Sequence, residues 1–254
     1  MKTNLSDIQN QTSYRLPATF ALFILLALPA GAQTVLNPSF EDSTLDDGAV
    51  SQGFDIPQWT LLTSFGGSGF AVFNPNDTWL SGTDGSGTAI GAHGTNVFST
   101  YNPTSVNYSG VYQVITGTPL TAGTTYTLTV AIGDYKDKLA NNWRLAISTS
   151  SMAFGTFLIN RTGSATLLTN DQFTDFTVTY TATGAEPKIG EDLKITLWSV
   201  NSGSGTHVPF DNVRFTAIVG PVPVPTFTVT ITPNAGNPGN YDFTWPSQDD
   251  KVYD

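Results

Sequence analysis

The chain has 254 residues, a formal net charge of -10 and no cysteine. The absence of cysteine excludes disulfides, thiolate metal sites and cysteine nucleophiles. An acidic chain repels phosphate backbones and anionic lipid head groups, so we expect no nucleic-acid partner, whereas cations and neutral ligands stay candidates. A charged fraction of only 12% and 24 glycines, together with abundant threonine, favour an all-β protein rich in turns.

Residues 1–32 have the pattern of a secretory signal peptide. Lys2 and Arg15 supply its positive charge, residues 16–28 are almost wholly apolar, and residues 30–32 are small, as at a cleavage site. The apolar run is shorter than the roughly 20 residues of a membrane-spanning helix, so we expect cleavage and no transmembrane segment afterwards. The mature protein is therefore predicted to be secreted, in the extracellular space or at the cell surface.

Strand periodicity runs through residues 33–219. Apolar side chains occupy every second position, most clearly in Thr125–Ile132, Phe176–Tyr180 and Leu193–Leu197. In chain order the predicted strands are 34–40, 59–63, 70–73, 96–100, 111–115, 125–132, 143–148, 157–160, 176–180, 193–197 and 213–219. About ten or eleven strands without helical crossovers indicate a two-sheet antiparallel jelly-roll sandwich.

The composition changes after residue 219. Residues 220–226 contain alternating prolines, which predict an extended linker. Residues 227–254 contain two further alternating runs, 227–232 and 241–245, and read as the start of a truncated C-terminal β domain. Two strands cannot bury a core of their own.

Several short motifs carry a family resemblance that covers about residues 35–217. Together they resemble galactose-binding-like jelly rolls, a group that includes carbohydrate-binding modules and exported bacterial proteins. Within that group the chain is also similar to the calcium-dependent Stig cyclases, which rearrange indole isonitrile precursors of alkaloids. The motifs are Asn37-Pro38-Ser39-Phe40-Glu41, Trp59, Val111-Tyr112-Gln113-Val114, the strand at 124–133 and Phe210-Asp211-Asn212-Val213-Arg214.

The resemblance implies a structural calcium held by Glu41 and Asp211. Calcium prefers six to eight hard oxygen ligands, and ligands from distant segments convert binding energy into folding energy. We expect Glu41 to end the first strand and Asp211 to open the last, so that the ion joins the two ends of the domain. Asn37, Ser39 and Asp42 are candidates for further oxygens. The alternative is an exposed strand-end acid and an ordinary turn cap.

Aromatic side chains are the candidate ligand platforms, because the apolar face of a sugar ring packs on them. We predict ligand binding at Trp79, Tyr101, Trp143 and Trp198. Trp198 points away from the inward face of its strand. For each aromatic the alternative is a structural role, and for Trp198 that role is packing under a loop or the second module. Trp59 is assigned to the core, whereas residues 134–138 are interpreted as a solvated loop.

Catalytic motifs are sparse. The histidines are His93 and His207, and no nucleophile elbow, metal-binding histidine pair or phosphate-cradling loop accompanies them, which argues against triad hydrolysis and zinc chemistry. The first hypothesis is therefore a secreted, non-catalytic binding module, carbohydrate-binding-like and stabilised by calcium. A structural protein for cell-surface display is another hypothesis.

The enzyme hypothesis is a calcium-dependent, cyclase-like protein. The resemblance implies an aspartate that protonates the substrate in an aromatic pocket, and Asp211 is the matching residue, with Phe98, Tyr101 and Trp143 as candidate pocket walls. A carboxylate bound to calcium is held ionised and is a poor proton donor, so Asp211 cannot serve both roles at once.

Overall fold

The computed structural model describes residues 31–51, 56–63, 69–76, 79–80, 91–102, 108–136, 138–200, 206–220, 230–233, 236 and 241–244. The predicted signal peptide, except its last two residues, lies outside the described residues, and so does most of the predicted linker. None of the helical structure in the described ranges has the length and apolarity that crossing a membrane requires.

The regular secondary structure of the described residues is strands, apart from one short 3-10 helix, η1 (Ala165–Leu167). The strands are β1 (Gly31–Gln33), β2 (Thr60–Thr63), β3 (Gly69–Phe73), β4 (Val97–Asn102), β5 (Tyr108–Pro119), β6 (Thr124–Gly133), β7 (Leu139–Ala140), β8 (Asn142–Thr149), β9 (Ile159–Gly163), β10 (Phe173–Thr181), β11 (Asp192–Val200), β12 (Thr206–Val219), β13 (Thr230–Pro233) and β14 (Tyr241–Thr244).

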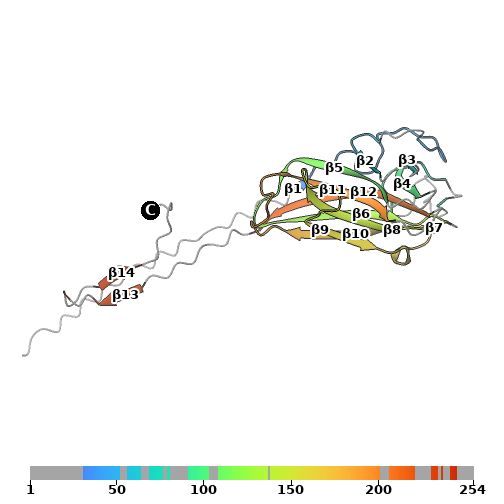
Figure 1. Ribbon diagram of the computed structural model, residues 1–254. Helices are drawn as coiled ribbons and strands as arrows, with labels where there is room; N and C mark the ends of the chain where they lie inside the picture. Colours follow the sequence, from blue (N-terminus) through green and yellow to red (C-terminus); the bar gives the residue numbers. More distant parts are fainter. Residues whose placement is uncertain are drawn as a thin grey trace, which may run out of the picture.

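Two antiparallel sheets face each other (Figure 1). One has the order β10-β6-β12-β4-β3, with β1 and β7 also paired to β12, and the other has the order β2-β5-β11-β8-β9. The short β7–β12 pair is parallel. Most neighbouring strands in the two sheets are far apart in sequence, as in a jelly roll, although β3–β4 and β8–β9 are consecutive, so the predicted all-β sandwich is confirmed.

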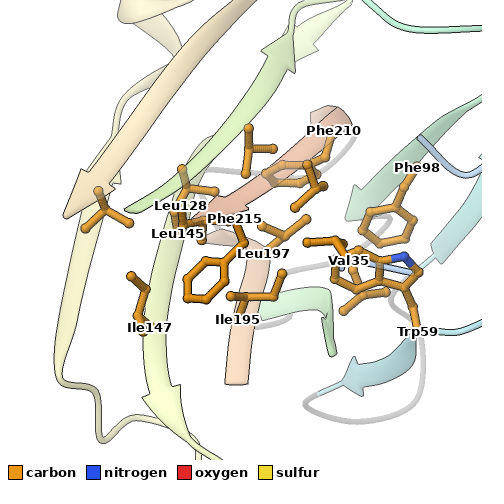
Figure 2. Packing of buried hydrophobic residues seen from close by; sticks show 14 of the residues in the cluster. Val35, Trp59, Phe98, Leu128, Leu145, Ile147, Ile195, Leu197, Phe210 and Phe215 are labelled. Carbon is orange, nitrogen blue, oxygen red and sulfur yellow. The ribbon is translucent and has the colours of Figure 1, made fainter. Parts of the chain in front are cut away.

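The core lies between the two sheets and follows the predicted alternation. In β6, Tyr126, Leu128 and Val130 point inward and are at most 1% exposed, while the threonines between them face outward. The opposing sheet contributes the inward side chains of β8 and β11 (Figure 2). Trp59 belongs to the same cluster at 6% exposure, as predicted.

The first predicted strand is wrong. Residues 34–40 form bends and turns after the short β1, because Asn37 (φ 45°) and Phe40 (φ 61°) adopt left-handed backbone conformations that no strand accommodates. Glu41 therefore lies in a turn instead of ending a strand. The last strand is longer than predicted, and Asp211 lies within β12 instead of opening it.

The C-terminal strands β13 and β14 pair with each other in a two-stranded antiparallel sheet. They fall within or across the predicted runs 227–232 and 241–245. The boundaries of the linker and of a second domain stay predictions.

Candidate active site and ion site

The carboxylates of Glu41, in the N-terminal turn, and of Asp211, in β12, lie where this turn contacts the strand. The Val213 amide donates to the Pro38 carbonyl oxygen at 2.8 Å, which attaches the turn to the strand. Glu41 and Asp211 then lie close enough for the Glu41 charge to act on Asp211. The predicted juxtaposition of these two side chains is therefore observed, although neither stands at a strand end.

One segment binds both carboxylates through its backbone. The His93 amide donates to Asp211 Oδ2 at 2.6 Å, and the Asn96 amide donates to Glu41 Oε1 at 2.7 Å. Between them, Gly94 has a φ of +81°, and a Cβ there would lie 2.5 Å from the Glu41 carboxyl carbon. Only glycine fits this approach without a shift.

The side chain of Asn96 adds an unsatisfied acceptor to this segment. Its Nδ2 donates to the carbonyl oxygens of Ser43 at 2.6 Å and Phe40 at 3.3 Å, which fixes the orientation of the amide. The Oδ1 atom is buried and has no hydrogen-bond partner. A buried acceptor without a donor carries a desolvation penalty, which a cation can remove.

Asp211 is fully buried, and this burial dominates its electrostatics. Burial raises its pKa from 3.8 to about 8. Hydrogen bonds from the His93 and Asn212 amides and from the Ser39 side chain oppose the rise, whereas the Glu41 charge adds to it. The ionised pair is thus unfavourable until a cation joins it.

The donor set is of the type that a hard cation prefers. The described residues contain no group of three or more His, Cys, Asp and Glu that could hold a metal, so two carboxylates would need amide or carbonyl oxygens to complete the shell. Of the predicted helpers, Ser39 hydrogen-bonds Asp211, the Asn37 Oδ1 accepts from the Asp42 amide, and Asp42 is exposed.

A cavity of about 240 Å³ lies on the outer face of the sheet that contains β12. Alternation explains part of its lining. Val72, Phe98 and Val208 point into the core, so the residues next to them in β3, β4 and β12 point outward, whereas Phe70 belongs to the core cluster and also reaches the cavity. The lining residues are Val50, Phe70, Ala71, Phe73, Trp79, Ser99, Tyr135 and His207.

Four rings pack edge to face around this cavity. The centroids of Trp79 and Tyr135 are 5.5 Å apart, and His207 lies 6.0 Å from Trp79 and 5.9 Å from Tyr135. Phe73 completes the group at 5.1 Å from Trp79. Edge-to-face packing fixes the ring planes and leaves an aromatic wall around the cavity.

The polar groups of the cavity are few and strongly desolvated. Burial, helped by the Lys138 charge, lowers the pKa of His207 to about 4. The Lys138 ammonium lies 4.5 Å from the Trp79 ring centroid. Burial raises the pKa of Tyr135, whose hydroxyl lies toward Ser99 without the geometry of a hydrogen bond.

The predicted ligand-binding aromatics separate into different places. Trp79 lines the cavity, and the backbone of Tyr101 pairs with His207, although the Tyr101 side chain lies outside what the structure describes. Trp143 is 0% exposed in the core, 4.3 Å from the ring of Phe176. Trp198 lies on the outer face of the other sheet.

Loop residues cover Trp198, which is 2% exposed, with Phe157 at 5.2 Å and Phe154 at 5.6 Å between ring centroids. This is the structural alternative considered for it. Phe98, a candidate pocket wall, is also in the core and stacks on Phe210.

Sequence reasoning missed His207 and Tyr135 as partners of one cavity. Tyr135 lies in the segment interpreted as a solvated loop, yet it is 1% exposed. Tyr135 lies just beyond the end of β6, and it joins a second small cluster with Ala131, Phe73 and Leu80. The signal in the sequence was the even spacing of Tyr135 from Ala131, which faces outward in β6.

Comparisons with known proteins give the family. A family model described as HpiC1-like, HpiC1 cyclase, matches residues 32–216, so the chain belongs to this family. The predicted similarity to Stig cyclases is confirmed. No curated protein matches the chain.

Solved cyclase structures share the fold. An apo cyclase from Fischerella sp. is 23% identical over 76% of this chain and 98% of its own, with a TM-score of 0.63. A Stig cyclase from Fischerella sp. TAU in complex with (3Z)-3-(1-methyl-2-pyrrolidinylidene)-3H-indole is 22% identical over 76% of this chain and 100% of its own, with a TM-score of 0.62. A Fischerella sp. TAU cyclase bound to 4-(1H-indol-3-yl)butan-2-one is 23% identical over the same shares, with a TM-score of 0.61.

The family match corrects the first functional hypothesis. A non-catalytic binding module was predicted because no familiar catalytic motif is present, but a model of a cyclase family covers nearly the whole jelly roll. The enzyme alternative fits better.

Proposed function

We propose that this chain is a calcium-dependent, Stig-type cyclase that binds a small indole-like substrate in the aromatic cavity beside His207. The observation that carries the proposal is the cavity itself: an aromatic wall with one half-buried imidazole, in a chain of the HpiC1-like family. The carbohydrate predicted as a partner is less suitable, because so few polar side chains line the cavity.

The cavity suits a reaction through a cation. The rings of Trp79, Tyr135 and Phe73 line the cavity, and a ring face carries partial negative charge, which stabilises a positive charge that develops on a substrate bound against it. The volume of about 240 Å³ is near the small end of ligand sites and fits a compact bicyclic molecule.

His207 is the proposed proton donor. Asp211, the donor suggested by the family resemblance, is not a lining residue, and both of its carboxylate oxygens accept backbone hydrogen bonds. A histidine whose pKa is held near 4 is a strong acid when protonated, so it can protonate a weakly basic substrate. Near neutral pH only a small fraction carries the proton, which makes the reaction faster in mild acid.

Glu41 and Asp211 are the proposed carboxylates of a calcium site. The supporting features are the like-charged pair, the backbone donors that fix it, and the unpartnered Asn96 Oδ1 in the same segment. Bound calcium would neutralise the pair and hold residues 93–96 against β12. In this assignment Asp211 is ionised and structural.

The binding test uses 4-(1H-indol-3-yl)butan-2-one as the probe in titration calorimetry with saturating calcium. Replacing Trp79 by Ala removes one wall and should weaken binding at least tenfold, since about 1.4 kcal/mol corresponds to that factor. Phe154→Leu, on the other sheet, is the control and should bind like the wild type. Equal binding by W79A and the wild type would place the probe elsewhere and refute this site.

The activity test offers the indole isonitrile precursor and follows a product of unchanged mass by chromatography and mass spectrometry. H207Q should lose about 100-fold or more of the rate, within the range of general acid catalysis. D211N, assayed at the same saturating calcium concentration, should lose less. The opposite order would assign the acid role to Asp211.

A further inference from the structure

A second cleft lies on the outer face of the other sheet, remote from the aromatic cavity. It has a volume of about 190 Å³ and lies between strands β2, β5, β8 and β11 and the loop at 150–158. Its lining residues are Leu62, Tyr112, Ser148, Ala153, Phe154, Phe157, Lys194 and Thr196. Neither the calcium site nor the proposed cyclase chemistry uses any of them.

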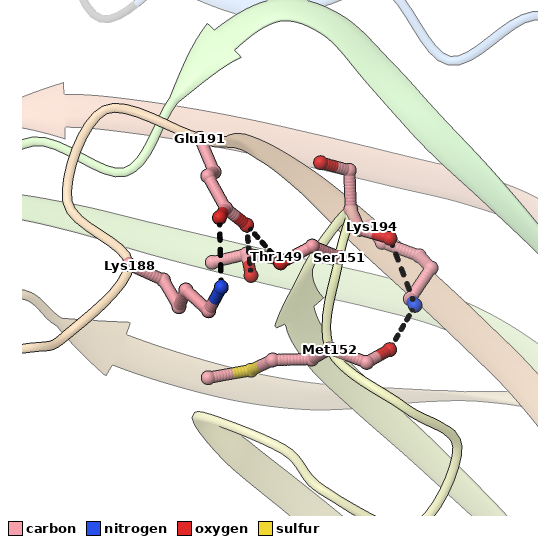
Figure 3. Close-up of polar contacts among 7 residues, drawn as sticks. Thr149, Ser151, Met152, Lys188, Glu191 and Lys194 are labelled. Atoms are coloured by element: carbon pink, nitrogen blue, oxygen red, sulfur yellow. Dashed lines mark hydrogen bonds and ion pairs between the residues drawn. The ribbon is translucent and has the colours of Figure 1, made fainter.

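The covering loop is held by polar contacts at its start (Figure 3). Glu191 Oε2 accepts hydrogen bonds from Ser151 at 2.6 Å and Thr149 at 2.9 Å, and its Oε1 pairs with Lys188 at 3.1 Å. These contacts lower the pKa of Glu191 to about 2, Ser151 contributing most. The loop wall is therefore positioned before any ligand arrives, which lowers the entropy cost of binding.

Lys194 is the cation of this cleft. Its Nζ donates to the Met152 carbonyl oxygen at 2.6 Å and to that of Ser150 at 3.4 Å, and it lies 5.6 Å from the centroid of the Tyr112 ring. Carbonyl oxygens satisfy donors but leave the positive charge unneutralised. Among the described residues, the two ion pairs use other cations, so no carboxylate is paired with Lys194.

The remaining walls are apolar and aromatic, and the sheet beneath carries hydroxyls. Phe154 and Phe157 come from the loop and Tyr112 from β5, whereas Ser148 and Thr196, at 1% and 2% exposure, lie on adjacent strands. Burial lowers the pKa of Lys194, which shows that its charge is partly desolvated. A desolvated charge is stabilised more by an ionised partner than by further neutral acceptors.

From this geometry we propose a second binding site, under the 150–158 loop, for a small aromatic carboxylate whose ring packs between Tyr112 and the loop phenylalanines and whose carboxylate meets Lys194. The site is separate from the cyclase cavity. It therefore stands whether or not the proposed cyclase function is correct.

The test compares two probes of nearly equal shape, 3-phenylpropanoate and 3-phenylpropan-1-ol, by titration calorimetry. The wild type should bind the carboxylate more tightly than the alcohol, and K194Q should weaken carboxylate binding by about 10- to 100-fold with little effect on the alcohol. K194R keeps the charge and should retain the preference. W79A, altered only in the other cavity, should bind both probes like the wild type.

One further variant separates charge from loop anchoring. E191Q weakens the loop contacts without touching the charge of the cleft, so it should keep the carboxylate preference. The proposal is overturned if neither probe binds, or if K194Q leaves the preference for the carboxylate over the alcohol unchanged. It is also overturned if E191Q or W79A abolishes this preference as fully as K194Q does.

Discussion

Without calcium, the D211N variant should be more stable than the wild type. With saturating calcium, it should be less stable than the wild type. The buried carboxyl has a pKa of about 8 in the folded state against 3.8 in the unfolded chain. Because the folded value is the higher one, this group contributes stability below pH 3.8 that is lost progressively as the pH rises to about 8.

The size of the loss follows from the two pKa values. At pH 7 the unfolded chain is ionised while folded Asp211 is still mostly protonated, a gap of about three pH units, which amounts to about 4 kcal/mol of lost stability. Asparagine removes this loss. The backbone amides of His93 and Asn212 donate to the two carboxylate oxygens of Asp211, but an asparagine side chain has only one oxygen. One amide therefore loses its acceptor, which lowers the free energy of unfolding by about 1–3 kcal/mol.

The net expectation is a gain of about 1–3 kcal/mol for D211N in excess chelator at pH 7. For a domain of this size that raises the melting temperature by about 5 °C in a thermal unfolding scan. Calcium reverses the order: at a thousand times the dissociation constant of the wild type it stabilises that protein by about 4.1 kcal/mol, which exceeds the advantage of D211N. The variant lacks one carboxylate of the site and should gain little.

Asp175→Asn is the matched control, because this exposed carboxylate pairs with Arg214 at the surface and contributes about 1 kcal/mol or less. Two results would refute the reasoning. One is a chelated D211N that melts below the wild type, and the other is an equal rise for both proteins on adding calcium.

Three further outcomes are expected. G94A should destabilise the protein by about 1–3 kcal/mol in chemical denaturation and weaken calcium binding, because its Cβ would clash with Glu41 and its φ is +81°. Unchanged stability would contradict the close approach of residue 94 to the Glu41 carboxylate. Y135F should be neutral or stabilising in the same assay, since it removes a buried hydroxyl without a hydrogen bond; a loss above about 1 kcal/mol would indicate a partner. With saturating calcium, the cyclisation rate should rise about tenfold for each unit that the pH falls between 7 and 5. The reason is that His207 has a pKa of about 4, so its protonated fraction rises about tenfold per pH unit in this range. H207Q should abolish this pH dependence.

The fold was predictable because apolar residues alternate with polar ones along the strands, and the buried side chains follow this period of two. The alternation in β6, β10 and β11 identified the inward faces, and the sheets pair these strands with the register that buries them. The first strand failed for a local reason, the left-handed conformations of Asn37 and Phe40. Side-chain pattern carries no direct signal for such a backbone reversal when glycine is absent.

The candidate site was only half predictable. The proximity of Glu41 and Asp211 was predicted from the sequence, because each residue belongs to a recognisable motif near one end of the domain. The cavity was not, because Trp79, Tyr135 and His207 come from three segments and meet on the outer face of a sheet, where alternation alone predicts solvent. Recognising it requires knowing which segment covers that face.

Strand β12 connects the two proposed centres. His207 and Asp211 lie four residues apart on it, both on the outer face, since Val208 and Phe210 point into the core. The segment that clamps Asp211, residues 93–96, belongs to the same connection between β3 and β4 that carries Trp79. Neutralising the carboxylates with calcium would therefore hold one end of the segment whose other end forms the cavity wall. In the proposed arrangement the ion would support catalysis by positioning the wall. Asp211 would be a ligand and His207 the acid, so one strand would serve both roles without Asp211 having to be ligand and acid together.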